Sequence, residues 1–405
     1  MMNSLRIVFV DDEPHIVRAL KRSMQTIENN WDMEFCQSGP EALAALERQP
    51  ADILLTDMRM PGMDGAELLN IVRTKYPDTI RVVLSGYADK DCVYRTVGPA
   101  HAYLEKPCEI NVLHDTLVRP LALRQILGDN DLRKVLGGMT NLPSIPEVFA
   151  QLLAELTSQD ASTGTVAKIV ERDMAMTAEL LKLTNSSYFA IGARITSALG
   201  VVKILGLDVV QSLVLKIGIF REFAGRADLG RSIESLSAYS LKLGHLAEAF
   251  ALEAGASTAE AKAAYCAAML TPIGSLFLLD ARTEEYEGVF SLIGNDLPLY
   301  VAEQAKFGVN HNLIGAYLLS LWGFSDLIVE AVTFAYTPSL CKSQNNHILT
   351  FVHAAIALGP KFPLLPPDVT PPRILDMAYL VECRFDNKIN HWHRLVDAEG
   401  EKSNG

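Results

Sequence analysis

The chain has 405 residues, of which 49% are hydrophobic and 21% charged, and this composition indicates a folded globular protein rather than a disordered one. Its length predicts two or three domains instead of a single core. The net charge of −12 disfavours sequence-independent binding to nucleic acids, because such binding depends on neutralising phosphates. Six scattered cysteines without a C-x-x-C pair indicate reduced thiols, and the N-terminus lacks a signal-peptide core, so we expect a cytoplasmic protein.

Short apolar runs alternate with helical patterns over the first 120 residues. We expect strands at 6–10, 33–36, 53–56, 80–85 and 102–105, and helices at about 14–27, 40–48, 65–75 and 89–97, with a fifth helix from 109. Pro14 and Pro40 stand at first helical positions, where a missing N–H group costs little. This alternation predicts an α/β domain of the flavodoxin-like type, with a parallel five-stranded sheet of order 2-1-3-4-5.

Acidic residues follow two of these strands and a lysine follows a third. Asp11 and Asp12 come after the first strand, Asp57 after the third and Lys106 after the fifth. The order 2-1-3-4-5 opens a crevice between strands 1 and 3 at the carboxyl edge, so these side chains are expected to lie together. So many like charges in one pocket require a divalent cation or a chemical role to offset their repulsion. The pattern therefore predicts a phosphorylation site.

The motifs of this region resemble those of the response-regulator receiver family. They are Val10-Asp11-Asp12-Glu13, the run from Asp57 to Gly65, Leu84-Ser85-Gly86, Tyr103 and Lys106-Pro107. The resemblance covers residues 1–120 and implies that a sensor histidine kinase phosphorylates Asp57. It also implies that Asp11, Asp12, Asp57 and the backbone carbonyl of Arg59 hold Mg²⁺, a hard cation that prefers oxygen ligands.

The same resemblance assigns roles to the remaining motif residues. Lys106 would neutralise phosphoryl charge, Ser85 would donate a hydrogen bond to a phosphoryl oxygen, and Tyr103 would be an aromatic switch that turns inward. The family has a cis peptide bond at the position of Lys106-Pro107. Two alternatives stay open on the residues alone, because Ser85 could cap the next helix and Tyr103 could be an ordinary strand residue.

A helical connector follows at 121–138. The fifth helix carries Ile110, Leu113 and Leu117 on one face, Pro120 is expected to interrupt it, and a second helical stretch runs from Leu121 to about 136. The apolar residues of this connector either pack against one of the two domains or form the seam of a homodimer. Three nearby histidines, His15, His101 and His114, have no paired acid or base and are expected on the surface.

From residue 139 to about 340 helical periodicity dominates, which predicts an all-α domain. This region resembles the HDOD domain, a divergent relative of HD-type metal-dependent phosphohydrolases. The resemblance is carried by residues 142–148, 169–173, 180–186, 195–199 and 204–207. Met174 departs from the family pattern, which usually has proline there. Residues 341–405 form a C-terminal extension with a helix at 349–358, a proline-rich run and a terminal helix.

Most metal ligands of the HD phosphohydrolases are replaced in this sequence. By motif alignment, the ligand positions fall at Tyr239, Thr271-Pro272, His311 and Ala335-Tyr336. Side chains of Tyr, Thr, Ala and Pro cannot assemble a dinuclear centre that activates water. We interpret His311, which starts a predicted helix, as a hydrogen-bonded core or cap residue, and we assign no metal ligands to this domain.

These patterns predict a two-component response regulator that is not an enzyme and whose output is a protein–protein interaction with an unidentified partner. The alternative is a metal-dependent phosphohydrolase with unorthodox ligands. Direct DNA binding is not expected, because the helical domain offers no basic recognition helix. The longest uncharged stretch, 263–279, is short for a membrane span and contains Pro272 and Gly274, so we expect a core helix pair there.

Overall fold

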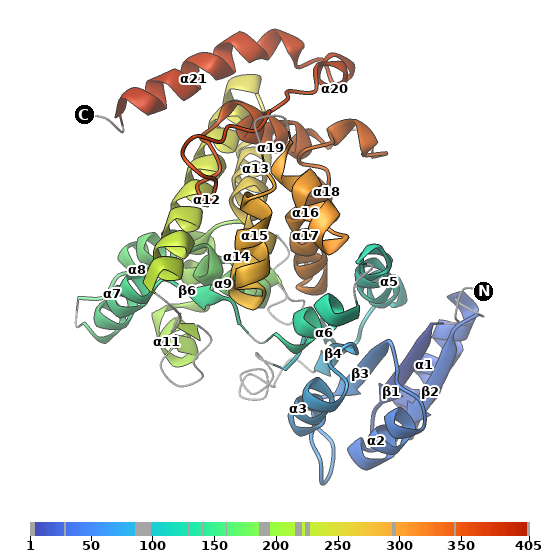
Figure 1. The fold of residues 1–405 in the computed structure, drawn as a ribbon. Coiled ribbons are helices and arrows are strands. Elements are labelled where there is room, and N and C mark those ends of the chain that lie inside the picture. The colour runs from blue at the N-terminus through green and yellow to red at the C-terminus, as the bar shows by residue number, and fades with distance from the viewer. Residues whose placement is uncertain are drawn as a thin grey trace.

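The computed structural model describes most of the chain as two packed bodies, an α/β domain and a larger helical region (Figure 1). The described residues are 5–27, 30–85, 99–127, 130–139, 141–158, 160–185, 195–214, 221–222, 227–293, 297–343 and 346–402. The helix expected at 89–97 lies outside these residues, and so does Gly86 of the Leu84-Ser85-Gly86 motif.

The N-terminal sheet has five parallel strands in the order β2-β1-β3-β4-β5, which confirms the predicted doubly wound arrangement. The strands are β1 (Arg6–Val10), β2 (Asp32–Cys36), β3 (Ile53–Asp57), β4 (Ile80–Ser85) and β5 (Ala102–Glu105). Their bounds agree with the predicted ones to within one residue. Every residue of β1 is buried, as expected for a strand that is covered on both faces.

Helices cover both faces of this sheet. Those described are α1 (Pro14–Ile27), α2 (Gly39–Arg48), α3 (Gly65–Lys75) and α5 (Ile110–Ile126). Because alternate strand residues point to opposite faces, Val8 and Leu54 share one buried cluster with Leu46 of α2 and Leu69 of α3. Ile7, Phe9 and Ile53 belong to the cluster on the other face, with Met24 of α1 and Leu113 of α5.

Helix α5 continues through Pro120, so the expected interruption at the proline is wrong. The break comes later, before α6 (Asn130–Gly138). Tertiary packing explains the difference, because Leu117 and Leu121 on either side of the proline are buried and α5 lies against α1 and α17. This packing holds the helix although the proline cannot donate a backbone hydrogen bond.

The helical region extends from α7 to α21 and confirms the predicted mostly helical architecture. Its helices are α7 (Pro146–Thr157), α8 (Thr163–Glu171), α9 (Met174–Asn185), α10 (Ala198–Leu205), α11 (Leu207–Ser212), α12 (Ala227–Ala254), α13 (Thr258–Leu270), α14 (Ile273–Ala281), α15 (Thr283–Phe290), α16 (Leu299–Phe307), α17 (His311–Leu321), α18 (Asp326–Thr333), α19 (His347–Leu358), α20 (Met377–Glu382) and α21 (Ile389–Lys402). A short parallel pair, β6 (Pro143–Ser144) and β7 (Arg221–Glu222), is the exception to the all-α prediction.

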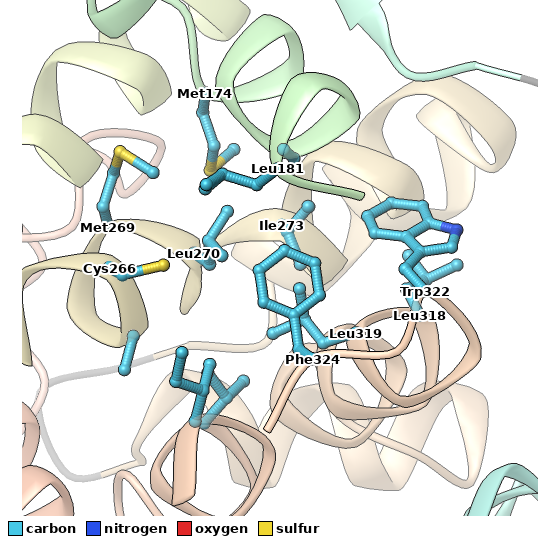
Figure 2. Packing of buried hydrophobic residues seen from close by; sticks show 14 of the residues in the cluster. Met174, Leu181, Cys266, Met269, Leu270, Ile273, Leu318, Leu319, Trp322 and Phe324 are labelled. Atoms are coloured by element: carbon cyan, nitrogen blue, oxygen red, sulfur yellow. The ribbon is translucent and has the colours of Figure 1, made fainter. Parts of the chain in front are cut away.

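Helices α13 and α14 form the centre of this region. Figure 2 shows Cys266, Met269, Leu270 and Ile273 of this pair facing Met174 and Leu181 of α9. By length and composition the run Thr258–Ala281 could cross a membrane, but 89% of its most apolar window is buried inside the protein. The prediction of a core helix pair in this stretch is therefore confirmed.

The C-terminal helices belong to the same body. Helix α19 packs against α12 and α13, and α21 packs against α12 and α19. Trp392 of α21 is fully buried, stacks on Phe250 with ring centroids 5.2 Å apart and donates its indole N–H to the Phe250 carbonyl at 3.3 Å. The residues after 340 therefore form part of the helical core and are not a separate appendage.

Candidate functional site

Three carboxylates and a lysine meet at the carboxyl edge of the sheet. Asp11, Asp12 and Asp57 each place one oxygen within 4.8 Å of the others. Strand register explains the meeting, because Val10 pairs with Thr56 and each of them directly precedes an aspartate. Hard divalent cations prefer such clusters of carboxylate oxygens, so the donor set fits Mg²⁺.

Lys106 bridges two of these carboxylates from the end of β5. Its Nζ lies 2.6 Å from Asp11 Oδ2 and 2.5 Å from Asp57 Oδ1. Burial by itself lowers the pKa of Lys106, but the hydrogen bonds and charges of Asp11 and Asp57 outweigh it and raise the pKa overall. The ammonium group is therefore firmly charged and held at the carboxylate that would react.

Asp57 is the more accessible of the two bridged carboxylates. Its side chain is 13% exposed, against 2% for Asp11. Burial raises the pKa of Asp57 and repulsion from Asp11 adds to this, whereas Lys106 opposes both. One ammonium group among three carboxylates leaves negative charge uncompensated, which is what a bound cation would offset.

The loop after β3 depends on a close backbone approach at Gly65. A Cβ at this position would lie 2.4 Å from the carbonyl oxygen of Asp57, and the Gly65 N–H donates to the Met58 carbonyl at 3.0 Å. Asp64 then caps α3 by accepting the N–H of Glu67 at 2.9 Å. Arg59, the predicted carbonyl ligand, is an exposed residue of this loop, and its role stays a prediction.

The remaining motif residues lie on β4 and β5. Ser85 ends β4 in register with Glu105, but its side chain lies outside the described part, so both readings of Ser85 remain predictions. Tyr103 pairs with Val83 and is 3% exposed, and both its role as a switch and the alternative of an ordinary strand residue remain predictions. The peptide bond between Lys106 and Pro107 is cis, as the receiver pattern predicted.

His101 is buried, so its predicted surface position is wrong. Its Nδ1 accepts the backbone N–H of Arg81 at 3.1 Å, and its Nε2 lies 2.8 Å from the Arg81 guanidinium. Burial lowers the pKa of His101 and the charge of Arg81 lowers it further. Arg81 also donates to the Gly137 carbonyl at 2.6 Å and thereby ties β4 to the end of α6. His15 is exposed as expected, and His114 is half-buried.

An interdomain cavity lies between β5, the first part of α5 and the helical region. It has an empty volume of about 870 Å³, part of it open to solvent, and its walls include Tyr103 on one side and Lys182 and Trp322 on the other. Lys182 is itself buried, with Nζ 3.5 Å from Glu179 Oε2 and 5.3 Å from the centre of the Trp322 ring. The strand that carries Tyr103 therefore faces charged and aromatic groups of the second domain.

The lost metal-ligand positions of the helical region have become hydrophobic core or cavity wall. Thr271 and Ala335 are buried, and the Thr271 hydroxyl donates to the Ala267 carbonyl at 2.9 Å. Tyr239 and Tyr336 line a cavity of the helical region. Across the part of the chain that is described, the aspartates Asp11, Asp12 and Asp57 are the only group of three or more His, Cys, Asp or Glu placed to hold a metal ion.

His311 is a hydrogen-bonded core residue at the start of α17. Its Nδ1 lies 2.5 Å from Glu303 Oε2, and its backbone N–H donates to the same oxygen at 3.0 Å. The Tyr286 hydroxyl donates to the other oxygen, Oε1, at 2.8 Å. Sequence reasoning identified His311 but missed Glu303, because nothing in the local pattern says that α16 places its carboxylate against α17.

Comparison with known families identifies both parts of the chain. Residues 7–118 match the response regulator receiver domain, and residues 142–338 match the HDOD domain. Hydrogenase transcriptional regulatory protein HoxA of Cupriavidus necator is 34% identical over 154 residues, which are 38% of this chain and 31% of that protein. Response regulator protein PilR of Pseudomonas aeruginosa is 28% identical over 124 residues, or 30% of this chain and 27% of that protein. The chain thus spans about a third or less of these curated relatives.

Among the solved structures that are similar, one covers about half of this chain and another covers about a third. The MmoQ response regulator from Methylococcus capsulatus is 18% identical, with a TM-score of 0.45 over 53% of this chain and 84% of that chain. The signal receiver domain of an HD domain-containing protein from Pseudomonas fluorescens is 26% identical, with a TM-score of 0.27 over 30% of this chain and 94% of that chain.

Proposed function

The chain is a response regulator that joins an N-terminal receiver domain to a C-terminal HDOD domain, and on this premise we propose that a sensor histidine kinase phosphorylates it on Asp57. A carboxylate oxygen of Asp57 attacks the phosphorus, a P–O bond forms, and the P–N bond to the kinase histidine breaks. The observation that carries this proposal is the contact of Lys106 Nζ with both Asp11 and Asp57.

The neighbours of Asp57 support the transfer electrostatically. Asp11, Asp12, Asp57 and the Arg59 carbonyl would hold Mg²⁺, which would neutralise charge on the phosphoryl oxygens. Lys106 stays charged and lies next to the acceptor oxygen, where it stabilises the negative charge that arrives. Ser85 would donate to a phosphoryl oxygen through its hydroxyl.

The signal would leave the receiver through β5 and α5. Tyr103 lies on β5 and borders the interdomain cavity, and Arg81 and His101 connect the same edge of the sheet to Gly137. A phosphoryl group on Asp57 changes the charge that Lys106 balances, so the strand that leads to Lys106 is the element it displaces most directly. We propose that this displacement exposes or hides a surface of the HDOD domain for an unidentified protein.

We also propose that the HDOD domain is not catalytic. The histidine that remains, His311, is engaged by Glu303, and His353 uses Nδ1 on the Ala335 carbonyl and Nε2 on the Asp376 N–H. Both ring nitrogens of His353 and the Nδ1 of His311 are thus already engaged within the domain. The alternative, a metal-dependent phosphohydrolase, requires a bound transition metal and turnover of cyclic dinucleotides, and finding both would establish it instead.

We do not propose that the output is direct DNA binding. The name of one curated relative, the hydrogenase transcriptional regulatory protein HoxA, refers to transcription, whereas PilR is named only a response regulator protein. Their matches cover 154 and 124 residues of this chain. Both matches are shorter than the HDOD match at residues 142–338, so neither can cover the whole of this output domain. The net charge of −12 also opposes binding to phosphates. A gel-shift titration at low salt is expected to show no retarded DNA.

Phosphate-affinity electrophoresis after incubation with acetyl phosphate and Mg²⁺ tests the input. Wild-type protein should show one slower band, which disappears in Asp57→Ala and when EDTA removes the cation. Asp64→Ser is the matched control, because it changes an aspartate of the same loop and keeps an N-cap for α3, so it should label normally. Equal labelling of Asp57→Ala would contradict the proposal.

A pull-down from the native cell extract tests the output. Phosphorylated wild-type protein and Asp57→Ala protein are immobilised and their captured proteins are compared. A partner enriched on one of the two supports output by interaction, whereas identical captured sets from both forms would contradict a phosphorylation-dependent surface.

A further inference from the structure

A second cavity lies inside the helical region, away from Asp57. It has an empty volume of about 730 Å³, part of it open to solvent. Its walls come from α12, the start of α16, the residues after α18, helix α19 and the proline-rich run 361–374. That run lies beyond the residues that match the HDOD domain, so this chain completes the cavity with its own extension.

The cavity has aromatic walls. The rings of Tyr300 and Tyr336 lie 5.2 Å apart at 33°, and those of Tyr239 and Phe362 lie 5.5 Å apart at 80°. Tyr336 in turn meets the ring of His311 edge-on at 5.5 Å. These contacts restrict the movement of the rings, and aromatic rings held in place are suited to a flat apolar group.

Two wall tyrosines offer polar groups to an occupant. Among the described residues, no hydrogen-bond partner is found for the hydroxyl of Tyr239 or Tyr336. Burial raises the pKa of both phenols above the ordinary value, so they stay protonated and act as donors. Hydroxyl groups at a cavity wall favour an occupant that can accept hydrogen bonds from them.

The charged residues of the cavity wall are both cations. They are Lys361 and Arg373, and no aspartate or glutamate is among the described residues that line the cavity. His353 also lines it, but burial lowers its pKa and both its ring nitrogens are engaged. In a chain with a net charge of −12, a wall that carries cations without carboxylates is selective for anions.

These cations still have donors to offer. The Lys361 ammonium donates to the carbonyls of Pro366 at 2.7 Å and Pro367 at 3.0 Å, which uses two of its three N–H groups. The Arg373 guanidinium donates from Nη1 to the Gly359 carbonyl, which leaves most of its five N–H groups. The Arg373 bond ties the end of the proline-rich run to the residue that follows α19, and the Lys361 bonds close a loop within the run, so both cations are positioned before any ligand arrives.

From this geometry we propose that the cavity binds a small anion with a planar aromatic ring. The ring lies against Tyr300 and Tyr336, and the anionic group meets Lys361 and Arg373 at the rim. An aromatic carboxylate and a nucleotide share this chemistry. The site is independent of phosphorylation at Asp57, and it gives the non-catalytic domain a ligand to sense.

Calorimetric titration of the full chain with four probes tests the proposal. Naphthalene carboxylate and AMP are the anionic probes, and naphthalene carboxamide and adenosine are their neutral counterparts. At least one anion should bind saturably and about tenfold more tightly than its neutral counterpart, because one charge-assisted contact is worth about that much. Binding of the carboxylate alone indicates an aromatic acid, binding of AMP alone a nucleotide, and binding of both the shared chemistry.

Variants locate the binding. The double change Lys361→Gln and Arg373→Gln should weaken the anion about tenfold and leave the neutral probe unchanged. Arg373 is exposed, so Arg373→Gln alone serves if the double variant melts at a lower temperature. The control Lys306→Gln changes an exposed cation of α16 that does not line the cavity and should bind as wild type. No saturable binding of either anion, equal binding of the neutral probes, or unchanged binding by the cation variants would overturn the proposal.

Discussion

Asp57 and His311 are both titratable residues at the ends of buried elements, but the charged groups around them differ. Asp57 faces two further carboxylates and one ammonium group, and its side chain stays 13% exposed. His311 faces one carboxylate, Glu303, whose two oxygens accept from Tyr286 and from His311 itself. The first arrangement leaves charge for a cation and a phosphoryl group, whereas the second is internally satisfied.

The difference shows how chemical competence can be read from hydrogen bonding in a two-domain protein. A site retained for chemistry keeps groups whose charges do not cancel, and accepts the cost of their repulsion. A site retained for folding pairs every polar group, because an unpaired buried group costs stability. The receiver edge has the first property, and the Glu303 carboxylate beside His311 has the second, since both of its oxygens accept hydrogen bonds.

The largest expected effect is a loss of stability in Gly274→Ala, which tests whether α14 and α17 are closely packed near His311. A Cβ at this position would lie 2.0 Å from the His311 carbonyl oxygen, so α14 and α17 must move apart. We expect the free energy of unfolding to fall by about 3 kcal/mol in denaturant titrations. The control Gly288→Ala, in α15, has open space around it and should be neutral or slightly stabilising. Equal stability of Gly274→Ala and wild type would contradict the packing.

Lys106→Ala tests the receiver side of the comparison. Because its Nζ lies 2.5 Å from Asp57 Oδ1, its loss removes the protein cation nearest to the acceptor oxygen. The rate of phosphorylation by acetyl phosphate should fall about a hundredfold, as when one electrostatic group of a reaction site is removed. Lys75→Ala, in the last turn of α3, is the control and should label at the wild-type rate. An unchanged rate in Lys106→Ala would show that the ammonium group takes no part.

A magnesium titration contrasts the two domains directly. Asp12→Ala removes one of the three clustered oxygens and should lower the affinity for Mg²⁺ at least about tenfold in calorimetry. His311→Gln should leave that affinity unchanged, since the His311 ring is engaged by Glu303. The comparison would fail if His311→Gln, rather than Asp12→Ala, weakened cation binding.

The smallest effect expected is a pH dependence from His353. Burial lowers its pKa, and its Nε2 accepts the Asp376 N–H, which only the neutral ring can do. The unfolded chain therefore binds more protons than the folded chain below about pH 6.5, so stability is complete above that pH and falls as the pH decreases. We expect the free energy of unfolding to decrease as the pH falls from about 6.5 to about 5.5.

His353→Gln provides the comparison for this effect. Its loss of stability over the same pH range should be smaller than that of wild type, although His101 contributes in the same direction in both proteins because burial also lowers its pKa. Denaturant unfolding at the two pH values measures the difference. Identical losses in the two proteins would assign the pH dependence to other groups.

The sheet and its edge could be predicted because their signals are local. Each strand is a short apolar run, and the residue type that follows it decides what reaches the carboxyl edge. Pro14 and Pro40, which lie in the first turns of α1 and α2, likewise mark where these helices begin. Parallel pairing then brings Asp11, Asp12, Asp57 and Lys106 together without further information.

The failures concern contacts between distant segments. His101 was placed on the surface because no partner stands near it in sequence, yet strand pairing sets it beside Arg81. Pro120 was expected to interrupt a helix that packing on α1 and α17 sustains. The roles of Glu303 and of the cations of the proline-rich run could not be predicted either. Each role depends on a contact with residues that only the tertiary fold brings close.

Hydrogen–deuterium exchange before and after phosphorylation tests most directly whether a phosphoryl group on Asp57 changes the conformation of the HDOD domain. With acetyl phosphate and Mg²⁺, wild-type protein should change its exchange in β5, at the start of α5 and at the end of α9, which border the interdomain cavity. Asp57→Ala should show no change under the same conditions. A labelled wild-type protein whose exchange changes only near residues 53–65, with β5 and α9 unaffected, would contradict the account.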